Sequence, residues 1–125
     1  RFLDALPRLY NADPDRLHLI GFSQGAALSF ATVLRHPPAA RSVAAMVGFV
    51  PRVAPEAVAG RLPDFPVYMA AGVEDPVVPV SEARQSADVL RAAGADLDYR
   101  EYPTEHKMTS AAIDDLRDWL QARRP

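Results

Sequence analysis

The sequence predicts an α/β fold in which helices cover both faces of a parallel sheet. Short apolar runs alternate with segments of helical periodicity along the chain. The first three of the four predicted strands are nearly continuous apolar runs, which is typical of strands that are buried on both faces. This alternation favours right-handed crossovers between parallel strands, with a functional site at the carboxyl ends of those strands.

The first half of the chain is predicted to contain two helices and two strands. A turn cluster separates the first helix from the first strand, and the dipeptide Pro37-Pro38 ends the second helix. We expect a helix over residues 1–10, a turn over 11–15, a strand over 17–22, a helix over 24–36 and a strand over 42–50.

The second half begins with a proline-rich connection, residues 51–66, that has room for one or two helical turns over 55–61. Ser81 is expected to cap the following helix, and Gly94 to end it in the left-handed conformation. The remaining predicted elements are a strand over 67–72, the capped helix over 81–93, an alternating strand over 97–102 and an amphipathic helix over 109–123. The alternation over 97–102 is typical of an edge strand or a half-exposed strand.

The composition excludes several classes of protein. The 14 basic and 16 acidic residues give a formal net charge of -2 without a basic run, so a nucleic-acid partner is not expected. The absence of cysteine excludes disulfides and a cysteine nucleophile and fits a reducing compartment, so we expect a cytoplasmic location. No apolar run approaches the length of a membrane span. The 125 residues suit one domain or part of one, and the first residue is Arg1 rather than Met.

Residues 21–25, Gly-Phe-Ser-Gln-Gly, fit the pattern G-x-S-x-G between a predicted strand and a predicted helix. In this pattern the serine lies on a sharp strand-to-helix turn that exposes its hydroxyl group, and the turn favours small residues at Gly21 and Gly25. Ser23 is therefore the candidate nucleophile. The backbone N–H of Gln24, at the positive end of the helix, is a candidate oxyanion donor. The alternative is a glycine-bounded turn with a structural serine.

A serine hydroxyl needs a base, and the chain contains three histidines. His106 follows the last predicted strand, at the same edge of the sheet as Ser23, and is the candidate base. His18 lies within the first predicted strand, where a local hydrogen bond is the simpler interpretation. His36 lies at a helix end, where its charge would interact favourably with the helix dipole.

The α/β-hydrolase order of nucleophile, carboxylate and histidine predicts a carboxylate after an intervening strand. Residues 73–79, VEDPVVP, follow the third predicted strand and offer both Glu74 and Asp75. A proline fixes the backbone beside Asp75 and two valines shield it from water, so Asp75 is the candidate that orients the histidine. Glu74 is interpreted as a solvent-facing neighbour, and Asp64 lies before the strand.

Four stretches together resemble the phospholipase/carboxylesterase family, which includes the acyl-protein thioesterases. They are GFSQGAAL, GVEDPVVP, LRAAGADLDYREYP and His106-Lys107-Met108, and they extend in the family's order from about residue 13 to residue 119. The resemblance implies the α/β-hydrolase fold and hydrolysis of carboxylic esters or acyl thioesters without a cofactor or metal. It implies Ser23, Asp75 and His106 as the catalytic triad and Phe49, Val78 and Met108 as acyl-pocket residues.

The chain departs from the family pattern at four places. Ala26 replaces a glycine that the family often has, and Val47 replaces a serine. Ala71 replaces a common histidine, and Thr104-Glu105 lie where the family usually has glycine. These departures leave the triad intact but bear on substrate preference and on the loop path. Glu105 would favour a charged imidazole if it approached His106.

The family also has an upstream glycine-rich stretch that supplies a second oxyanion donor, and the 125 residues contain no such stretch. We therefore expect residues 1–125 to be the C-terminal part of a single α/β-hydrolase domain, from the nucleophile elbow to the C-terminal helix, lacking the N-terminal strands. The strand over 17–22 would then lie at a sheet edge. Such an edge favours a partner chain that carries the upstream strands, or a homo-oligomer.

Three functions fit these residues. The first is a serine hydrolase of esters or thioesters, acting through an acyl-enzyme on Ser23. The second is a folded half-domain that is inactive alone and needs a partner chain. The third is a peptidase on the same fold, which would use the same triad and is separated from an esterase only by its substrate.

Overall fold

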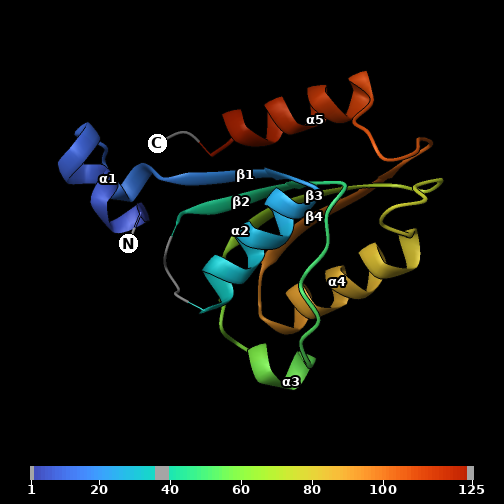
Figure 1. The fold of residues 1–125 in the computed structure, drawn as a ribbon, viewed down its shortest axis with the longest axis horizontal. Coiled ribbons are helices and arrows are strands. Elements are labelled where there is room, and N and C mark those ends of the chain that lie inside the picture. Colours follow the sequence, from blue (N-terminus) through green and yellow to red (C-terminus); the bar gives the residue numbers. More distant parts are fainter. Residues whose placement is uncertain (1, 36–39, 124–125) are drawn as a thin grey trace.

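The computed structural model describes residues 2–35 and 40–123, which form a four-stranded sheet with helices on both faces (Figure 1). The elements are α1 (Phe2–Tyr10), η1 (Pro14–Arg16), β1 (His18–Phe22), α2 (Gln24–Arg35), β2 (Ser42–Met46), α3 (Pro55–Val58), β3 (Pro66–Gly72), α4 (Val80–Ala92), β4 (Asp96–Tyr102) and α5 (Ser110–Gln121). The predicted order of strands and helices is confirmed.

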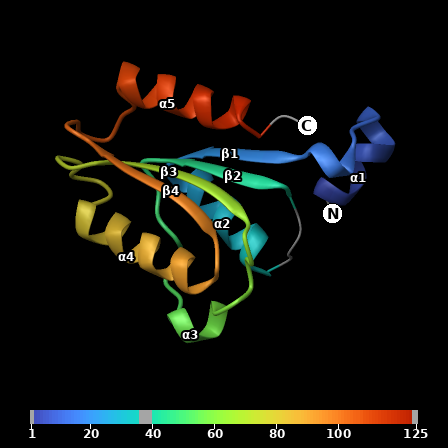
Figure 2. The same ribbon diagram turned by 180° about the vertical axis from the view of Figure 1, so that it is seen from behind.

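The four strands lie side by side in chain order, and all neighbouring pairs are parallel. Helices α2, α3 and α4 lie on one side of the sheet and α5 lies on the other, as both views show (Figures 1 and 2). The larger core cluster packs α2 and α4 against the sheet around Phe30, Met69 and Leu90. A smaller cluster packs α5 against the opposite face through Tyr68 and Trp119. The predicted α/β architecture with helices on both faces is confirmed.

The parallel arrangement brings the carboxyl ends of all four strands to one edge. Ser23 follows β1, Val47 follows β2, and the segment after Gly72 follows β3. The loop that contains His106 follows β4. Because these segments share one edge of the sheet, side chains more than 80 positions apart in the sequence can meet there.

The second strand is shorter than the sequence predicts. The expectation of a strand over residues 42–50 is wrong after Met46, because Val47 adopts a left-handed backbone conformation with φ of 45° and turns the chain away from the sheet. Gly48 then packs so closely on α2 that a Cβ there would overlap the Cβ of Ala26. The close approach of this turn to α2 explains why the apolar run 42–50 continues beyond the strand.

The start of α4 also differs from the expectation. Ser81 lies inside the helix, because the N–H groups of Glu82 and Ala83 already bond to the carbonyl oxygen of Pro79. The predicted end of the helix is confirmed, since Gly94 has φ of 92° and follows the C-cap residue Ala93. Left-handed backbone of this kind is accessible to glycine without steric cost.

Strand β1 lies at one edge of the sheet. The apolar run over 17–22 predicts a strand that is covered on both faces, and this expectation is wrong for β1. Ile20 is 53% exposed and Phe22 is 47% exposed, because α5 covers the other strands and leaves this face of β1 open. The alternating strand β4 lies at the opposite edge, as predicted. Within residues 2–35 and 40–123, every helix is too short or too polar to cross a bilayer.

Candidate active site

The turn between β1 and α2 holds Ser23 in a left-handed conformation, with φ of 54°. The N–H of Ser23 donates to the carbonyl oxygen of Met46 at 2.9 Å, which ties the turn to the neighbouring strand. Its carbonyl oxygen accepts from the N–H groups of Ala26 and Ala27 and so begins α2. A non-glycine residue held at positive φ is strained, and such strain is common where a side chain must project from a sharp turn.

The two glycines of the motif are not equally required. A Cβ on Gly21 would overlap the backbone of Gly25 and Ala26, which confirms the steric reason predicted for Gly21. A Cβ on Gly25 would meet nothing within 4 Å, so the expectation that only a small residue fits there is wrong. A side chain at Gly21 would face the start of α2 at close range, whereas a side chain at Gly25 would face open space.

Three of the residues that the sequence singled out meet at the carboxyl edge of the sheet. Ser23 Oγ lies 3.0 Å from His106 Nε2, and His106 Nδ1 lies 2.7 Å from Asp75 Oδ2. The side chain of Asp75 is 1% exposed and that of His106 is 21% exposed. Each imidazole nitrogen therefore has one oxygen partner, so the ring is held between a hydroxyl group and a buried carboxylate.

The two carboxylate oxygens of Asp75 have separate partners. Oδ2 faces His106, while Oδ1 accepts from the N–H groups of Val77 and Val78 at 2.7 and 2.9 Å. Burial is the largest single influence and would raise the pKa of Asp75, but the hydrogen bonds from His106, Val78 and Val77 together outweigh it and hold the pKa below its usual value. The carboxylate is therefore charged as well as fixed in orientation.

The loop that carries His106 rests on the segment that follows β3. The N–H of Val73 donates to the carbonyl oxygen of Tyr102, and the N–H of Glu74 donates to that of Thr104. A Cβ on Gly72 would overlap the carbonyl oxygens of Thr104 and Glu105. The loop that carries His106 passes over Gly72 at a distance that only glycine permits. This close approach places His106 over Asp75.

One contact at the site was not predicted from the sequence. The ring of Phe22 lies against the imidazole of His106, with the ring centroids 5.5 Å apart and a tilt of 58° between the planes. Tilted aromatic pairs at this separation attract each other modestly. The two backbone donors to Asp75 were also missed, because backbone groups leave no signal in the residue types.

The other candidate residues are more dispersed. Gln24 is the first residue of α2, so its N–H has no acceptor within the helix. Val78 is buried beside Asp75, Phe49 is half-buried after β2, and Met108 packs against the α5 cluster. Their grouping into one acyl pocket stays a prediction.

In the described part of the chain, the remaining carboxylate alternatives form no hydrogen bond or ion pair with His106. Glu74 and Glu105 are exposed. Among the described residues, Asp75 is the carboxylate that bonds to His106. His18 Nδ1 lies 2.6 Å from Ser42 Oγ, which fits the local hydrogen bond expected for it. His36 and the Pro37-Pro38 helix stop lie outside the described residues.

A serine on a strained strand-to-helix turn, with a histidine and a buried carboxylate in hydrogen-bonding series, is the geometry of an α/β-hydrolase site. The comparison with solved structures agrees on the fold. A carboxylesterase of Bacillus cereus superposes with a TM-score of 0.88 at 23% identity, covering 97% of this chain and 56% of that chain. The fold is therefore that of an α/β-hydrolase.

Residues 8–123 match the model of the phospholipase/carboxylesterase family, and this chain belongs to that family. An acyl-protein thioesterase 1 of Gibberella zeae is 30% identical over 120 residues, which cover 90% of this chain and 50% of the relative. A protein of Oryza sativa subsp. japonica, described as a probable inactive carboxylesterase, is 28% identical over 112 residues, 87% of this chain and 46% of the relative. The chain thus spans about half the length of these curated relatives.

Proposed function

We propose that this chain carries the catalytic residues of a serine hydrolase that cleaves carboxylic esters or acyl thioesters through an acyl-enzyme on Ser23. The observation that carries the proposal is the hydrogen-bonded series from Ser23 through His106 to the buried Asp75. Membership of the phospholipase/carboxylesterase family supports the same class of reaction.

In the proposed reaction, Ser23 Oγ attacks the carbonyl carbon of the substrate while its proton passes to His106 Nε2. The tetrahedral intermediate collapses, the bond to the alcohol or thiol breaks, and His106 returns the proton to that leaving group. Water then attacks the acyl-enzyme by the same route and releases the acid. Asp75 holds the imidazole in orientation and stabilises its charged form throughout.

The negative charge of each tetrahedral intermediate needs hydrogen-bond donors. We propose the N–H of Gln24 as one of them, because it has no acceptor within the helix and lies at the positive end of α2 next to Ser23. Phe49, Val78 and Met108 are proposed to contact the acyl group. The short connection between β2 and β3 leaves little chain for a large lid, so we expect short or medium acyl esters to be preferred over amides.

A second proposal concerns the chain by itself. Strand β1 is an exposed edge of the described sheet, with Ile20 and Phe22 open to solvent. We propose that this edge pairs either with strands from another chain or with a second copy of this chain, in the cytoplasm.

The test of the hydrolase proposal is a rate comparison across a series of p-nitrophenyl esters of increasing acyl length, matched thioesters and a matched amide. We expect ester and thioester cleavage above the rate of Ser23→Ala, with the amide slowest. Glu74→Ala serves as the matched control, because it removes an exposed carboxylate beside the site. An amide cleaved faster than every ester would assign the chain to the peptidases, and rates equal to those of Ser23→Ala would refute the proposal.

A further inference from the structure

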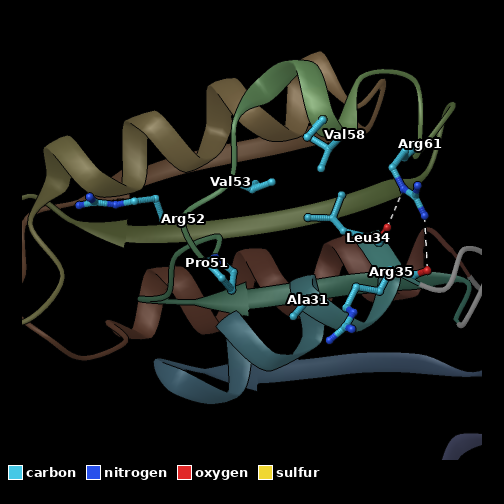
Figure 3. A pocket seen from close by; sticks show the side chains of 9 residues that line it. Ala31, Leu34, Arg35, Pro51, Arg52, Val53, Val58 and Arg61 are labelled. Atoms are coloured by element: carbon cyan, nitrogen blue, oxygen red, sulfur yellow. Dashed lines mark hydrogen bonds between the residues drawn. The ribbon is translucent and has the colours of Figure 1, made fainter.

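A groove of about 640 Å³ lies on the face of the sheet that α2, α3 and α4 cover (Figure 3). The carboxyl half of α2 forms one wall, and the segment that follows β2, together with α3, forms the other. At a rise of about 1.5 Å per residue, Leu34 in this groove is roughly 15 Å along α2 from Gln24. None of the candidate triad residues lines the groove, so it is a separate feature of the molecule.

The floor of the groove is apolar and its ends are cationic. Leu34, Val53 and Val58 lie in its middle, with Arg61 at one end and Arg52 at the other (Figure 3). Arg35 also lines it, and no Asp or Glu is among the lining residues. An apolar floor that carries three arginines and no carboxylate complements a ligand with an apolar body and a negative charge.

The arginines of this groove differ from most others in the described part of the chain. Six arginines there form ion pairs with carboxylates, namely Arg41, Arg84, Arg91, Arg100, Arg117 and Arg123. Five others, Arg8, Arg16, Arg35, Arg52 and Arg61, form none with another described residue. Three of these five line the groove. Among the described residues, three of the five arginines without a carboxylate partner thus lie at one place, in a chain with a net charge of -2.

Arg61 makes the end of the groove suitable for an anion. Its Nε donates to the carbonyl oxygen of Leu34 at 2.7 Å, and Nη2 donates to that of Arg35 at 3.4 Å. These carbonyl groups form the negative end of α2, which would otherwise repel an anion. The guanidinium group covers them, while the side chains of Arg35 and Arg52 make no hydrogen bond to another described residue.

We propose that this groove binds a fatty carboxylate, an alkyl chain with one carboxylate group, at a site separate from Ser23. The alkyl chain lies along the apolar floor, and the carboxylate accepts hydrogen bonds from the arginine guanidinium groups, whose fork of donors fits two oxygens. The volume is within the range of about 300–1,000 Å³ that is usual for small-molecule sites. Binding here involves no residue of the proposed triad, so the proposal stands or falls independently of the hydrolase activity.

The test is a titration of the ¹⁵N-labelled chain with sodium dodecanoate below its micellar concentration, followed by amide NMR. We expect saturable shifts at Leu34, Val53 and Val58. Dodecanol has the same chain without the charge, and acetate has the charge without the chain. Each of these two probes is expected to shift those amides far less than dodecanoate does at the same concentration.

Two variants distinguish recognition of the carboxylate from nonspecific hydrophobic binding. The double variant Arg35→Gln with Arg52→Gln is expected to bind dodecanoate about tenfold more weakly, because two solvent-exposed charge contacts to the carboxylate are lost. Arg8→Gln is the matched control, since Arg8 also lacks an ion pair with a described residue but lies on α1, and it should bind as the parent chain does. Urea midpoints equal to that of the parent show that each variant is folded.

The proposal is overturned if dodecanol shifts the same amides as strongly as dodecanoate, or if the double variant binds with unchanged affinity. It is also overturned if the shifts map to the exposed apolar residues Ile20, Phe22 and Leu28 near the β1 edge. Shifts confined to the groove, dependent on both the carboxylate and the arginines, establish the site.

Discussion

At the scale of single residues, the candidate site depends on how one carboxylate is held. Asp75 divides its two oxygens between His106 and two backbone N–H groups, and burial removes competing water. Glu74, one position earlier, points to solvent. The two carboxylates are neighbours in the sequence but occupy opposite environments, so a paired substitution separates their roles.

We predict that Asp75→Ala lowers the rate of ester hydrolysis strongly, whereas Glu74→Ala leaves it within about twofold. In a serine hydrolase of this kind, loss of the nucleophile or the base costs on the order of a millionfold in turnover, and loss of the carboxylate about a hundredfold less than that. Steady-state rates on one activated ester measure this order. If Glu74→Ala is the damaging change, the assignment of the carboxylate is wrong.

The sequence predicted much of this site because side-chain chemistry is visible in residue types. Ser23, Asp75 and His106 each follow a predicted strand, and parallel strands bring such positions to one edge. The backbone donors to Asp75 and the contact of Phe22 with His106 leave no such signal. They depend on the path of the chain after the strands, which residue types specify only weakly.

At the scale of elements, the strand-to-helix turn at Ser23 is constrained on one side only. We predict that Gly21→Ala destabilises the fold by about 1–3 kcal/mol, because its Cβ would overlap the backbone of α2. Gly25→Ala is expected to be neutral or to stabilise by up to about 1 kcal/mol, because its Cβ enters open space and alanine favours the helix. Urea unfolding of the two variants measures the difference. Equal destabilisation by both would contradict the geometry of the turn.

The packing of α4 against β4 includes an acid-sensitive ion pair. Glu101 accepts from Arg84 Nε and Nη2 at 2.8 and 2.9 Å and from the hydroxyl of Tyr99 at 2.7 Å. The hydrogen bond from Arg84, and next that from Tyr99, lower the pKa of Glu101 to about 2. A pKa that is lowered on folding stabilises the fold above the ordinary value of 4.5, and this contribution is lost as the pH falls toward 2.

We therefore predict that the free energy of unfolding falls more steeply between pH 5 and about pH 2 in the parent chain than in Glu101→Gln, since the glutamine cannot take up a proton. Urea midpoints at several pH values in this window give the two slopes. The other carboxylates titrate in both proteins, so only the difference matters. Parallel slopes would show that the ion pair does not couple to folding.

The elements themselves were predicted better than their ends. Strand–helix alternation depends on hydrophobic periodicity, which the sequence carries directly. The early end of β2 depends instead on Val47, a β-branched residue that tertiary packing holds at positive φ. No local sequence pattern predicts this conformation. Likewise Pro79 rather than Ser81 precedes α4, because the backbone carbonyl of Pro79 already accepts the first helical N–H groups.

At the scale of the whole molecule, the sheet has one alternating edge and one apolar edge. Strand β4 alternates and carries charged residues, as edge strands commonly do. Strand β1 instead presents Ile20 and Phe22 to solvent beside its unpaired edge. The relatives are about twice as long as this chain, and the proposal of a partner at β1 follows from the exposed edge itself.

We predict that the chain self-associates in sedimentation velocity at micromolar concentrations, and that Ile20→Lys shifts it toward monomer. Lysine on an edge strand opposes strand pairing through charge and solvation. Leu9→Lys is the matched control, because Leu9 is 63% exposed and lies on the helix α1 rather than on a strand. Association that responds equally to both variants, or a parent chain that stays monomeric throughout, would contradict pairing of β1 with a second copy of this chain.

The central claim is that Ser23 is a nucleophile activated by His106, and covalent labelling tests it most directly. The chain is treated with a fluorophosphonate probe, and the modified peptide is identified by mass spectrometry. We predict one adduct, on Ser23, that is absent in Ser23→Ala and forms at least about a hundredfold more slowly in His106→Ala, because the base is gone. Labelling of another serine, or labelling of Ser23 that does not depend on His106, would contradict the account.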